Sequence, residues 1–388
     1  MQRVMSTSWL VAVVLGCGPA STPSPAQSQG SAPASPQPAS TAGVVRAETV
    51  ARGLVHPWGL AFLPDGRMLV TEKPGRLRLV SADGRLGEPL GGVPEVFARG
   101  QGGLLDVAVD PRFAENRLVY LSYSEPGEGG TAGTAVARGR LGEGRLDSVQ
   151  VIYRQRPKLQ GGGHYGSRLV FARDGKLFVT QGDRMNHRDS AQALSAGMGK
   201  VMRIDPDGTV PRDNPFAGRD GAQPEVWSYG HRNVQAAALD PASGQLWTVE
   251  HGARGGDELN HPEAGKNYGW PVITYGRDYS GARIGEGTAR AGMEQPVYYW
   301  DPVIAPSGMA FYTGDAIPGW KGSVLVGSMS PGALVRLVLE NGRVAREERY
   351  LGDLGERIRD VQQAPDGRLY VITDSDAGRI LRVVPAGR

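Results

Sequence analysis

A histidine inside a glycine-rich run is the residue of this sequence that could most directly do chemistry. His164 follows Gly161-Gly162-Gly163 and precedes a strand pattern at residues 169–171. Glycine lets the backbone take positive φ and approach another molecule closely, and histidine is the side chain most easily held as a base near neutral pH. Asp183 follows the next strand pattern, and its carboxylate could orient the other ring nitrogen. On its own, the motif is more typical of a turn histidine.

Three arginines stand in comparable loops. Arg232 lies in Gly-His-Arg-Asn at residues 230–233, while Arg357 and Arg359 lie in the segment 355–360. Guanidinium groups bind carboxylates in a bidentate manner, so these residues predict a site for an anion. Arg357 and Arg359 alternate along a strand pattern and would face one side of it. The alternative is ordinary surface pairing with Glu356 or Asp360.

Hard oxygen ligands occur at residues 252–258. Asp257, Glu258 and the carbonyls of the glycine-rich stretch before them suit Ca²⁺, although a solvated turn would have the same composition. His231 is as typical of a structural histidine as of a functional one. Four histidines show no zinc-ligand spacing and predict no role: His56, His187, His251 and His261.

Six irregular repeats must position these groups. Two of them contain an apolar strand, a Pro-Asp-Gly turn at 64–66 or 365–367, and a second strand, and the repeats begin near residues 59, 104, 169, 236, 308 and 361. Asp-Gly between alternating apolar runs predicts a hairpin, and repeated units that are nearly all strand predict propeller blades. We therefore expect an all-β fold, a six-bladed β-propeller of four-stranded antiparallel sheets.

Equivalent blades would gather the polar loops on one face. The segments that precede the first strands carry Gln101, His164, Arg232 with Asn233, and the pair Arg357 and Arg359. Loops on a rigid scaffold commonly carry function. The repeat therefore predicts that these residues, distant in sequence, converge around the propeller axis.

Composition agrees with this fold and excludes one class of partner. Among 388 residues there are 57 Gly and 28 Pro, and aromatic residues make up only 7%, which suits a turn-rich β protein. The net charge is +3, with no basic block, so the sequence predicts no nucleic-acid partner.

The N-terminus predicts export. Residues 9–15 are apolar but too short to span a bilayer, and they resemble a signal-peptide core that ends in the lipobox-like Val14-Leu15-Gly16-Cys17. We expect residues 1–17 to be a lipoprotein-type signal peptide whose Cys17, the only cysteine, carries the lipid. A soluble signal peptide is the alternative.

The rest of the chain divides in two. Residues 18–44 are rich in Ser, Pro, Ala and Gln and predict a disordered tether, and residues 45–388 form the propeller domain. Gly18, in place of an aspartate, favours the outer membrane, so the protein would face the periplasm and touch the membrane only through its lipid anchor. A monomer or a homodimer would fit.

Five motifs in order resemble the soluble PQQ-dependent aldose sugar dehydrogenases, also called the glucose/sorbosone dehydrogenase family. They occupy residues 163–169, 230–235, 250–258, 267–271 and 357–360. The resemblance runs from about residue 56 to the C-terminus. It implies a six-bladed propeller that uses PQQ and Ca²⁺ to oxidise aldoses at C1 to aldonolactones and passes the electrons to an external acceptor.

The resemblance also implies roles for single residues. His164 would take the proton from the C1 hydroxyl while hydride passes to PQQ, Asp183 would hold that histidine, and Arg232 would stabilise negative charge on the quinone oxygens. The implied PQQ contacts are Gln101, His164, Arg232, Asn233, Arg357 and Arg359. The carbonyls of Gly252 and Ala253 would bind the Ca²⁺ that polarises PQQ, Glu258 and Tyr268 would bind a structural Ca²⁺, and Asp257 would support these ligands.

One departure from the family pattern concerns charge. Where some members have a lysine that reaches PQQ, this sequence has Ser330 within residues 327–332. Either PQQ binding is weaker or another cation substitutes. The loops 184–187 and 275–290 would set sugar specificity.

Two other functions stay open. A metal-dependent sugar-lactone hydrolase would hold its metal mainly by carboxylate and Asn side chains near the axis. A non-catalytic propeller would bind a protein or glycan at the cell surface, and would have no use for a base beside an arginine.

Overall fold

The structure is a computed structural model that describes residues 39–40 and 44–387. The predicted signal peptide with Cys17 lies outside the described residues, as does most of the predicted tether. Two residues of the tether region are described as the short strand β1 (Ala39–Ser40), which pairs in parallel with the outer strand of the fifth blade.

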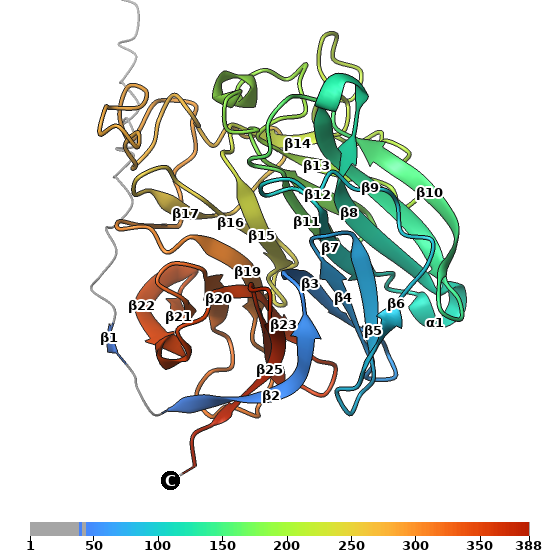
Figure 1. The fold of residues 1–388 in the computed structure, drawn as a ribbon. Coiled ribbons are helices and arrows are strands. Elements are labelled where there is room, and N and C mark those ends of the chain that lie inside the picture. The colour runs from blue at the N-terminus through green and yellow to red at the C-terminus, as the bar shows by residue number, and fades with distance from the viewer. Residues whose placement is uncertain (1–38, 41–43, 388) are drawn as a thin grey trace, which may run out of the picture. The chain divides into compact units, whose positions relative to one another are not determined.

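Six antiparallel sheets of four strands form a ring in the described part of the chain (Figure 1), which confirms the predicted propeller. The first three blades comprise β3 (Pro57–Phe62), β4 (Met68–Glu72), β5 (Arg76–Val80) and β6 (Leu86–Pro89); β7 (Leu104–Val109), β8 (Leu118–Pro126), β9 (Ala132–Leu141) and β10 (Leu146–Arg154); and β11 (Gly166–Phe171), β12 (Leu177–Gln181), β13 (Lys200–Ile204) and β14 (Val226–Tyr229).

The last three blades comprise β15 (Val234–Leu239), β16 (Leu246–Glu250), β17 (Asp257–Asn260) and β18 (Tyr298–Trp300); β19 (Pro306–Phe311), β20 (Val324–Ser328), β21 (Ala333–Glu340) and β22 (Arg343–Tyr350); and β23 (Ile358–Gln363), β24 (Leu369–Thr373), β25 (Gly378–Pro385) and β2 (Val45–Leu54). The described helices are single turns: α1 (Phe113–Asn116), η1 (Glu128–Gly130), η2 (Arg188–Ala191) and η3 (Gly352–Leu354).

Each predicted repeat begins inside the innermost strand of a blade. β3, β7, β11, β15, β19 and β23 pack side by side around the axis. The closure of the ring was not predicted from the repeats: β2, at the start of the domain, pairs antiparallel with β25 at its end and becomes the outer strand of the sixth blade. The two ends of the domain therefore hold the ring together.

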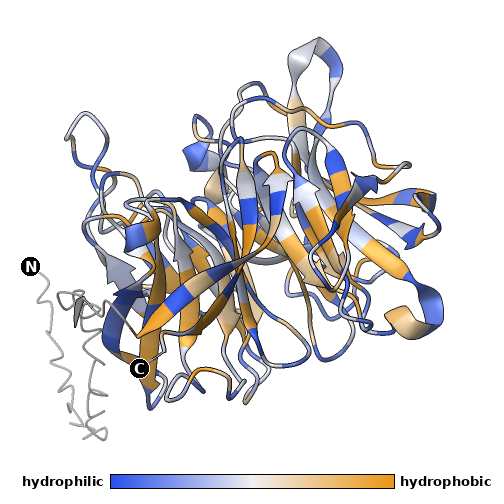
Figure 2. Cartoon of the chain, turned by 60° about the horizontal axis from the view of Figure 1, so that its bottom comes forward, coloured by the Kyte–Doolittle hydropathy of each residue, from blue (hydrophilic) through white to orange (hydrophobic). Residues whose placement is uncertain are grey.

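Burial explains why these segments are apolar. β4, β12, β16 and β20, the second strands of four blades, are buried at every residue, because neighbouring blades cover both faces of each sheet. Each pair of neighbouring blades encloses its own apolar cluster. Figure 2 shows the hydrophobic residues concentrated along the strands. The Asp-Gly turns lie at the opposite end from the candidate site, and Gly66 and Gly367 there take φ of +83° and +82°.

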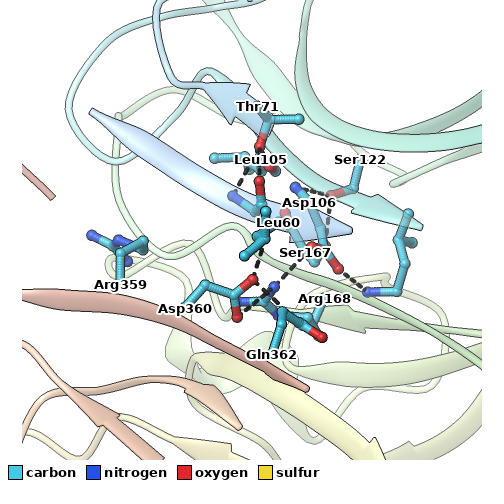
Figure 3. A network of polar contacts seen from close by, with 12 residues as sticks. Leu60, Thr71, Leu105, Asp106, Ser122, Ser167, Arg168, Arg359, Asp360 and Gln362 are labelled. Carbon is cyan, nitrogen blue, oxygen red and sulfur yellow. Dashed lines mark hydrogen bonds and ion pairs between the residues drawn. The ribbon is translucent and has the colours of Figure 1, made fainter. Parts of the chain in front are cut away.

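A buried ion cluster ties the inner strands together across the axis (Figure 3). Arg168 of β11 donates to Asp106 of β7 at 2.8 Å and lies 3.3 Å from Asp360 of β23. The backbone N–H of Leu60 in β3 donates to Asp360 at 3.0 Å. The Arg168 guanidinium also lies 4.5 Å from the ring centre of Trp58. Charged side chains from the second, third and sixth blades are therefore paired beneath the loops that carry the predicted site.

Candidate active site

A cavity of about 320 Å³ opens where the inner strands begin. Its walls come from two kinds of position: residues at or before the first strand of a blade, and residues just after the second strand. Of the predicted cofactor contacts, Gln101, Arg357 and Arg359 line it. A larger cavity, of about 620 Å³, lies at the other end of the axis among apolar residues of the inner strands. The charged residues in its wall, Asp106 and Arg168, already pair with each other. The smaller cavity is therefore the better candidate for an active site.

His164 and Asp183 meet as predicted. His164 Nδ1 lies 2.6 Å from Asp183 Oδ1, and both side chains are buried. A carboxylate only accepts hydrogen bonds, so Nδ1 carries the hydrogen. The other oxygen, Asp183 Oδ2, accepts from Trp270 Nε1 at 2.8 Å. The imidazole is therefore held in one tautomer, and within the described residues its Nε2 has no hydrogen-bond partner.

The backbone that carries His164 is fixed from several sides. His164 has φ of +49°, in the left-handed region, and its N–H donates to Gln101 Oε1 at 2.8 Å. Arg184, expected in a specificity loop, is instead buried and donates to the carbonyl of Gly163 at 3.0 Å. Gln101 and Arg184 thus fix the glycine-rich run that presents the histidine.

His164 is a neutral group at neutral pH. Burial lowers the pKa of its imidazole below the usual value of 6.5, the hydrogen bond to Asp183 opposes that effect, and the nearby charges of Arg232 and Arg184 add to it. A neutral imidazole with an open Nε2 is the form that can accept a proton.

Arg232 and Asn233 lie beside this pair, at the start of β15. Arg232 Nη1 donates to the carbonyls of His251, at 3.1 Å, and of Gly252. Its guanidinium lies 5.2 Å from the ring centre of Trp270, the residue that bonds Asp183. Asn233 Oδ1 accepts from the backbone N–H of Gly166 at 3.2 Å.

Arg357 and Arg359 both face the cavity, as their alternation predicted. Arg359 donates to Asp374 at 2.7 Å and to Gln235 at 3.2 Å, and Arg357 is half-exposed, 3.6 Å from Asp374. The alternative pairing with Glu356 or Asp360 does not form, because Glu356 binds Arg379 and Asp360 pairs with Arg168. Burial alone would raise the pKa of Asp374, but Arg359 and His56 hold it well below its usual value.

The predicted calcium loop is organised by Asp257. Its carboxylate accepts from the backbone N–H groups of Gly252 at 2.7 Å and of Ile304 and Ala305 at 2.8 Å each, and burial raises its pKa to about 6. Gly252 and Ala253 are buried in this loop, and the Gly252 carbonyl faces the guanidinium of Arg232. This carbonyl oxygen therefore already lies against a positive charge.

Glu258 and Tyr268 border one acidic cluster. Asn260 Nδ2 donates to Glu258 at 3.1 Å and to Glu250 at 2.9 Å. Glu250 bonds His231, on whose ring Tyr268 stacks at 4.7 Å. Burial, with Glu250 nearby, raises the pKa of Glu258 to about 8. Over residues 39–40 and 44–387, no group of three or more His, Cys, Asp or Glu side chains could hold a metal, so a cation here would need backbone oxygens as well.

Sequence reasoning missed several cavity residues. Lys73, His251 and Asp374 line the cavity, and each directly follows the second strand of a blade. His251 Nε2 lies 2.7 Å from the Pro306 carbonyl, and burial lowers its pKa to about 3, so it stays neutral. Their shared place directly after the second strand, one residue before the place that Asp183 takes in the third repeat, is the signal that could have found them.

Fold and site together define a propeller enzyme in which a buried His–Asp pair stands beside a cavity lined by arginines. The family model "Glucose / Sorbosone dehydrogenase" matches residues 54–382, and the chain belongs to this family. The aldose sugar dehydrogenase YliI of Escherichia coli strain K12 is 48% identical over 346 residues, which cover 88% of this chain and 93% of that protein.

Solved structures agree. The apo-form of the soluble aldose sugar dehydrogenase from Escherichia coli matches with a TM-score of 0.86 at 47% identity and covers 88% of this chain and 99% of its own. The PQQ-bound form of an aldose sugar dehydrogenase from Streptomyces coelicolor matches with a TM-score of 0.73 at 31% identity, over 88% of this chain and 98% of its own.

Proposed function

We propose that this protein oxidises aldose sugars at C1 to aldonolactones, with PQQ and Ca²⁺ as cofactors, and passes the electrons to an external acceptor. The observation that carries the proposal is the buried His164–Asp183 pair with an open Nε2, beside a cavity lined by arginines. Family membership and the PQQ-bound relative support the same conclusion.

Unpartnered polar atoms on three of the predicted cofactor contacts fit an oxygen-rich anion such as PQQ, which carries three carboxylates. Arg232 Nε, Asn233 Nδ2 and Arg359 Nε are buried without a hydrogen-bond partner in the protein. Leaving a buried donor without a hydrogen-bond partner costs roughly 1–3 kcal/mol, so a ligand that accepts hydrogen bonds from all three groups would recover that energy. Arg357 and Arg359 would bind carboxylates, and Arg232, Asn233, Gln101 and His164 would complete the contacts.

His164 would act as the base. Its neutral imidazole would take the C1 hydroxyl proton at Nε2, and Asp183 would stabilise the imidazolium formed, since it already holds the Nδ1 hydrogen. PQQ, when bound, supplies a quinone that accepts hydride from C1. Arg232 would place positive charge where negative charge develops on the quinone oxygens.

Calcium would take oxygen ligands in two places. The carbonyls of Gly252 and Ala253 would hold the ion that polarises PQQ, in the loop organised by Asp257. Glu258 and Tyr268 would hold the structural ion. Glu250 and Glu258 share Asn260 without any arginine or lysine within ion-pair distance in the described chain. Burial and Glu250 raise the pKa of Glu258, so a cation bound there would favour the ionised form of Glu258.

The two alternatives fit less well. The axial carboxylates that a lactone hydrolase would need for its metal, Asp106 and Asp360, are both already paired with Arg168. A non-catalytic propeller that binds a surface partner would have no use for the buried His164–Asp183 pair with Arg232 beside it.

Export remains a proposal from the sequence. Cys17 would carry a lipid that anchors the protein to the outer membrane, and the propeller domain would face the periplasm. The protein would be a monomer or a homodimer. In the described ranges, every helix is too short or too polar to cross a membrane.

The test is reconstitution. Purified apo-protein is mixed with PQQ and CaCl₂, and reduction of a redox dye is followed with glucose and other aldoses, with omission of PQQ as the control. We expect dye reduction only when PQQ, Ca²⁺ and an aldose are all present. Absence of reduction with every aldose would overturn the proposal, and hydrolysis of a sugar lactone by the same sample would support the hydrolase.

A further inference from the structure

A lysine that no sequence motif singled out faces the cavity. Lys73 follows β4, and its half-buried side chain lines the cavity together with Arg357 and Arg359. Its Nζ donates to the carbonyl of Gly100 at 3.1 Å. An ammonium has three N–H donors, so two of them remain for a ligand.

No carboxylate neutralises this lysine. Within the described residues, none lies within ion-pair distance of Lys73 Nζ. Its sequence neighbour Glu72 binds Arg76, at 2.8 Å, and Arg78, at 3.3 Å. The one acidic residue in the cavity wall, Asp374, already binds Arg359 at 2.7 Å and His56 at 2.8 Å.

The cavity wall therefore carries an excess of positive charge. Three cations, Lys73, Arg357 and Arg359, face one carboxylate, Asp374. Burial lowers the pKa of Lys73; Asp374 opposes that effect, and the two arginines add to it. Burying like charges without counter-charge is unfavourable, and a multiply charged anion in the cavity would relieve it. The unpartnered Nε of Arg359, whose side chain is over nine-tenths buried, points to the same ligand.

We propose that Lys73 is a third cationic contact for the carboxylates of PQQ, acting with Arg357 and Arg359. This inference rests on the proposed function. Lys73 comes from the first blade and the arginines from the adjoining sixth blade, so carboxylates bound there would bridge the two blades. Lys73 would thereby supply from the first blade the charge that Ser330 cannot supply from the fifth.

The test measures PQQ binding without turnover. Calcium-loaded apo-protein is titrated with PQQ, and the Kd is read from quenching of tryptophan fluorescence, because Trp58 lines the cavity. The titration is repeated at several salt concentrations for wild type, Lys73→Gln, Lys73→Arg and Lys321→Gln. Lys321 is an exposed lysine paired with Asp315 in the loop between β19 and β20, at the other end of its blade, and serves as the matched control.

Loss of one charge-assisted hydrogen bond should raise the Kd of Lys73→Gln about tenfold or more, with a weaker dependence on salt. Lys73→Arg keeps the charge and should stay within about threefold of wild type, and Lys321→Gln should bind as wild type does. Thermal unfolding of each apo-protein checks that it is folded.

The outcomes separate the two claims. If wild type binds PQQ and Lys73→Gln binds it with equal affinity and equal salt dependence, the role of Lys73 is wrong and the proposed function stands. If Lys73→Arg binds as poorly as Lys73→Gln, positive charge is not what the site uses, and the inference is overturned. If wild type does not bind PQQ at all, the proposed function itself fails.

Discussion

Two blades contain the same histidine–carboxylate arrangement and use it differently. His164 precedes β11 and His231 precedes β15, and each ring bonds through Nδ1 to a carboxylate at the end of the second strand of its own blade. The distances are 2.6 Å to Asp183 and 2.9 Å to Glu250, and in both pairs the partners are 19 residues apart in sequence. The repeat of the fold thus produces the same pair twice.

The second ring nitrogen distinguishes them. His231 Nε2 lies 2.9 Å from the hydroxyl oxygen of Ser228, and its ring is stacked on Tyr268 and entirely buried. His164 Nε2 has no partner in the described chain and stands beside the cavity. The fold therefore orients a histidine in both blades, whereas the surroundings of Nε2 decide whether that histidine can react.

The largest expected effect separates the two histidines by activity. His164→Ala should lower kcat about 10²–10⁴-fold, the usual contribution of a general base, and leave PQQ binding largely intact. His231→Gln should stay within about tenfold of wild-type kcat but unfold more easily, because a buried hydrogen-bonded group is disturbed. Steady-state dye reduction and thermal unfolding measure both. If both variants fold and bind PQQ and lose kcat equally, His164 and His231 do not differ in their role in the reaction.

The pH dependence provides a sharper comparison. His164 must be neutral to accept a proton, and its pKa lies below the usual 6.5, so activity should persist below pH 6.5 and fall at lower pH as the ring becomes protonated. The hydrogen bond that His164 donates to Asp183 raises that pKa. Asp183→Asn should therefore lower kcat about 10²-fold or more and move the acid limb of kcat/KM to lower pH.

Glu250→Gln is the matched control, since it alters the equivalent carboxylate of the other pair. Its acid limb should stay where wild type has it. An acid limb that does not move in Asp183→Asn, or that moves equally in Glu250→Gln, would show that Asp183 does not set the titration of His164.

The smallest expected effect concerns the Ser228 hydroxyl, which is the hydrogen-bond partner of His231 Nε2. Ser228→Ala removes the partner of Nε2 and should lower the free energy of unfolding by about 1–3 kcal/mol, with kcat and the pH profile unchanged. Urea unfolding followed by fluorescence measures the first quantity. A large loss of activity in folded Ser228→Ala would mean that His231 takes part in the reaction.

The fold was largely predictable because its signals are local. Each inner strand begins with an apolar run that the sequence displays directly, and the pairing of His164 with Asp183 follows from their places around the same two strands. The closure of the ring was not predictable in this way, because β2 and β25 come from opposite ends of the domain and pair through backbone groups that any residues provide.

The site was predictable in part for the same reason. Loops with distinctive motifs identified His164, Arg232 and Arg359. Lys73 and Asp374 are single charged residues without a motif, and their meaning depends on which charges they face after folding. His231 and His164 look alike in sequence, and the difference between them arises from Ser228, three residues before His231, and from Tyr268, which lies on a distant segment.

The most direct test of the base is the first half-reaction alone. Wild type, His164→Ala and His231→Gln are loaded with PQQ and Ca²⁺, mixed anaerobically with an aldose and no electron acceptor, and the absorbance of the cofactor is followed by stopped flow. We predict rapid reduction in wild type and in His231→Gln, and reduction slowed at least about 100-fold in His164→Ala. Reduction of the cofactor in His164→Ala at the wild-type rate would show that His164 is not the base.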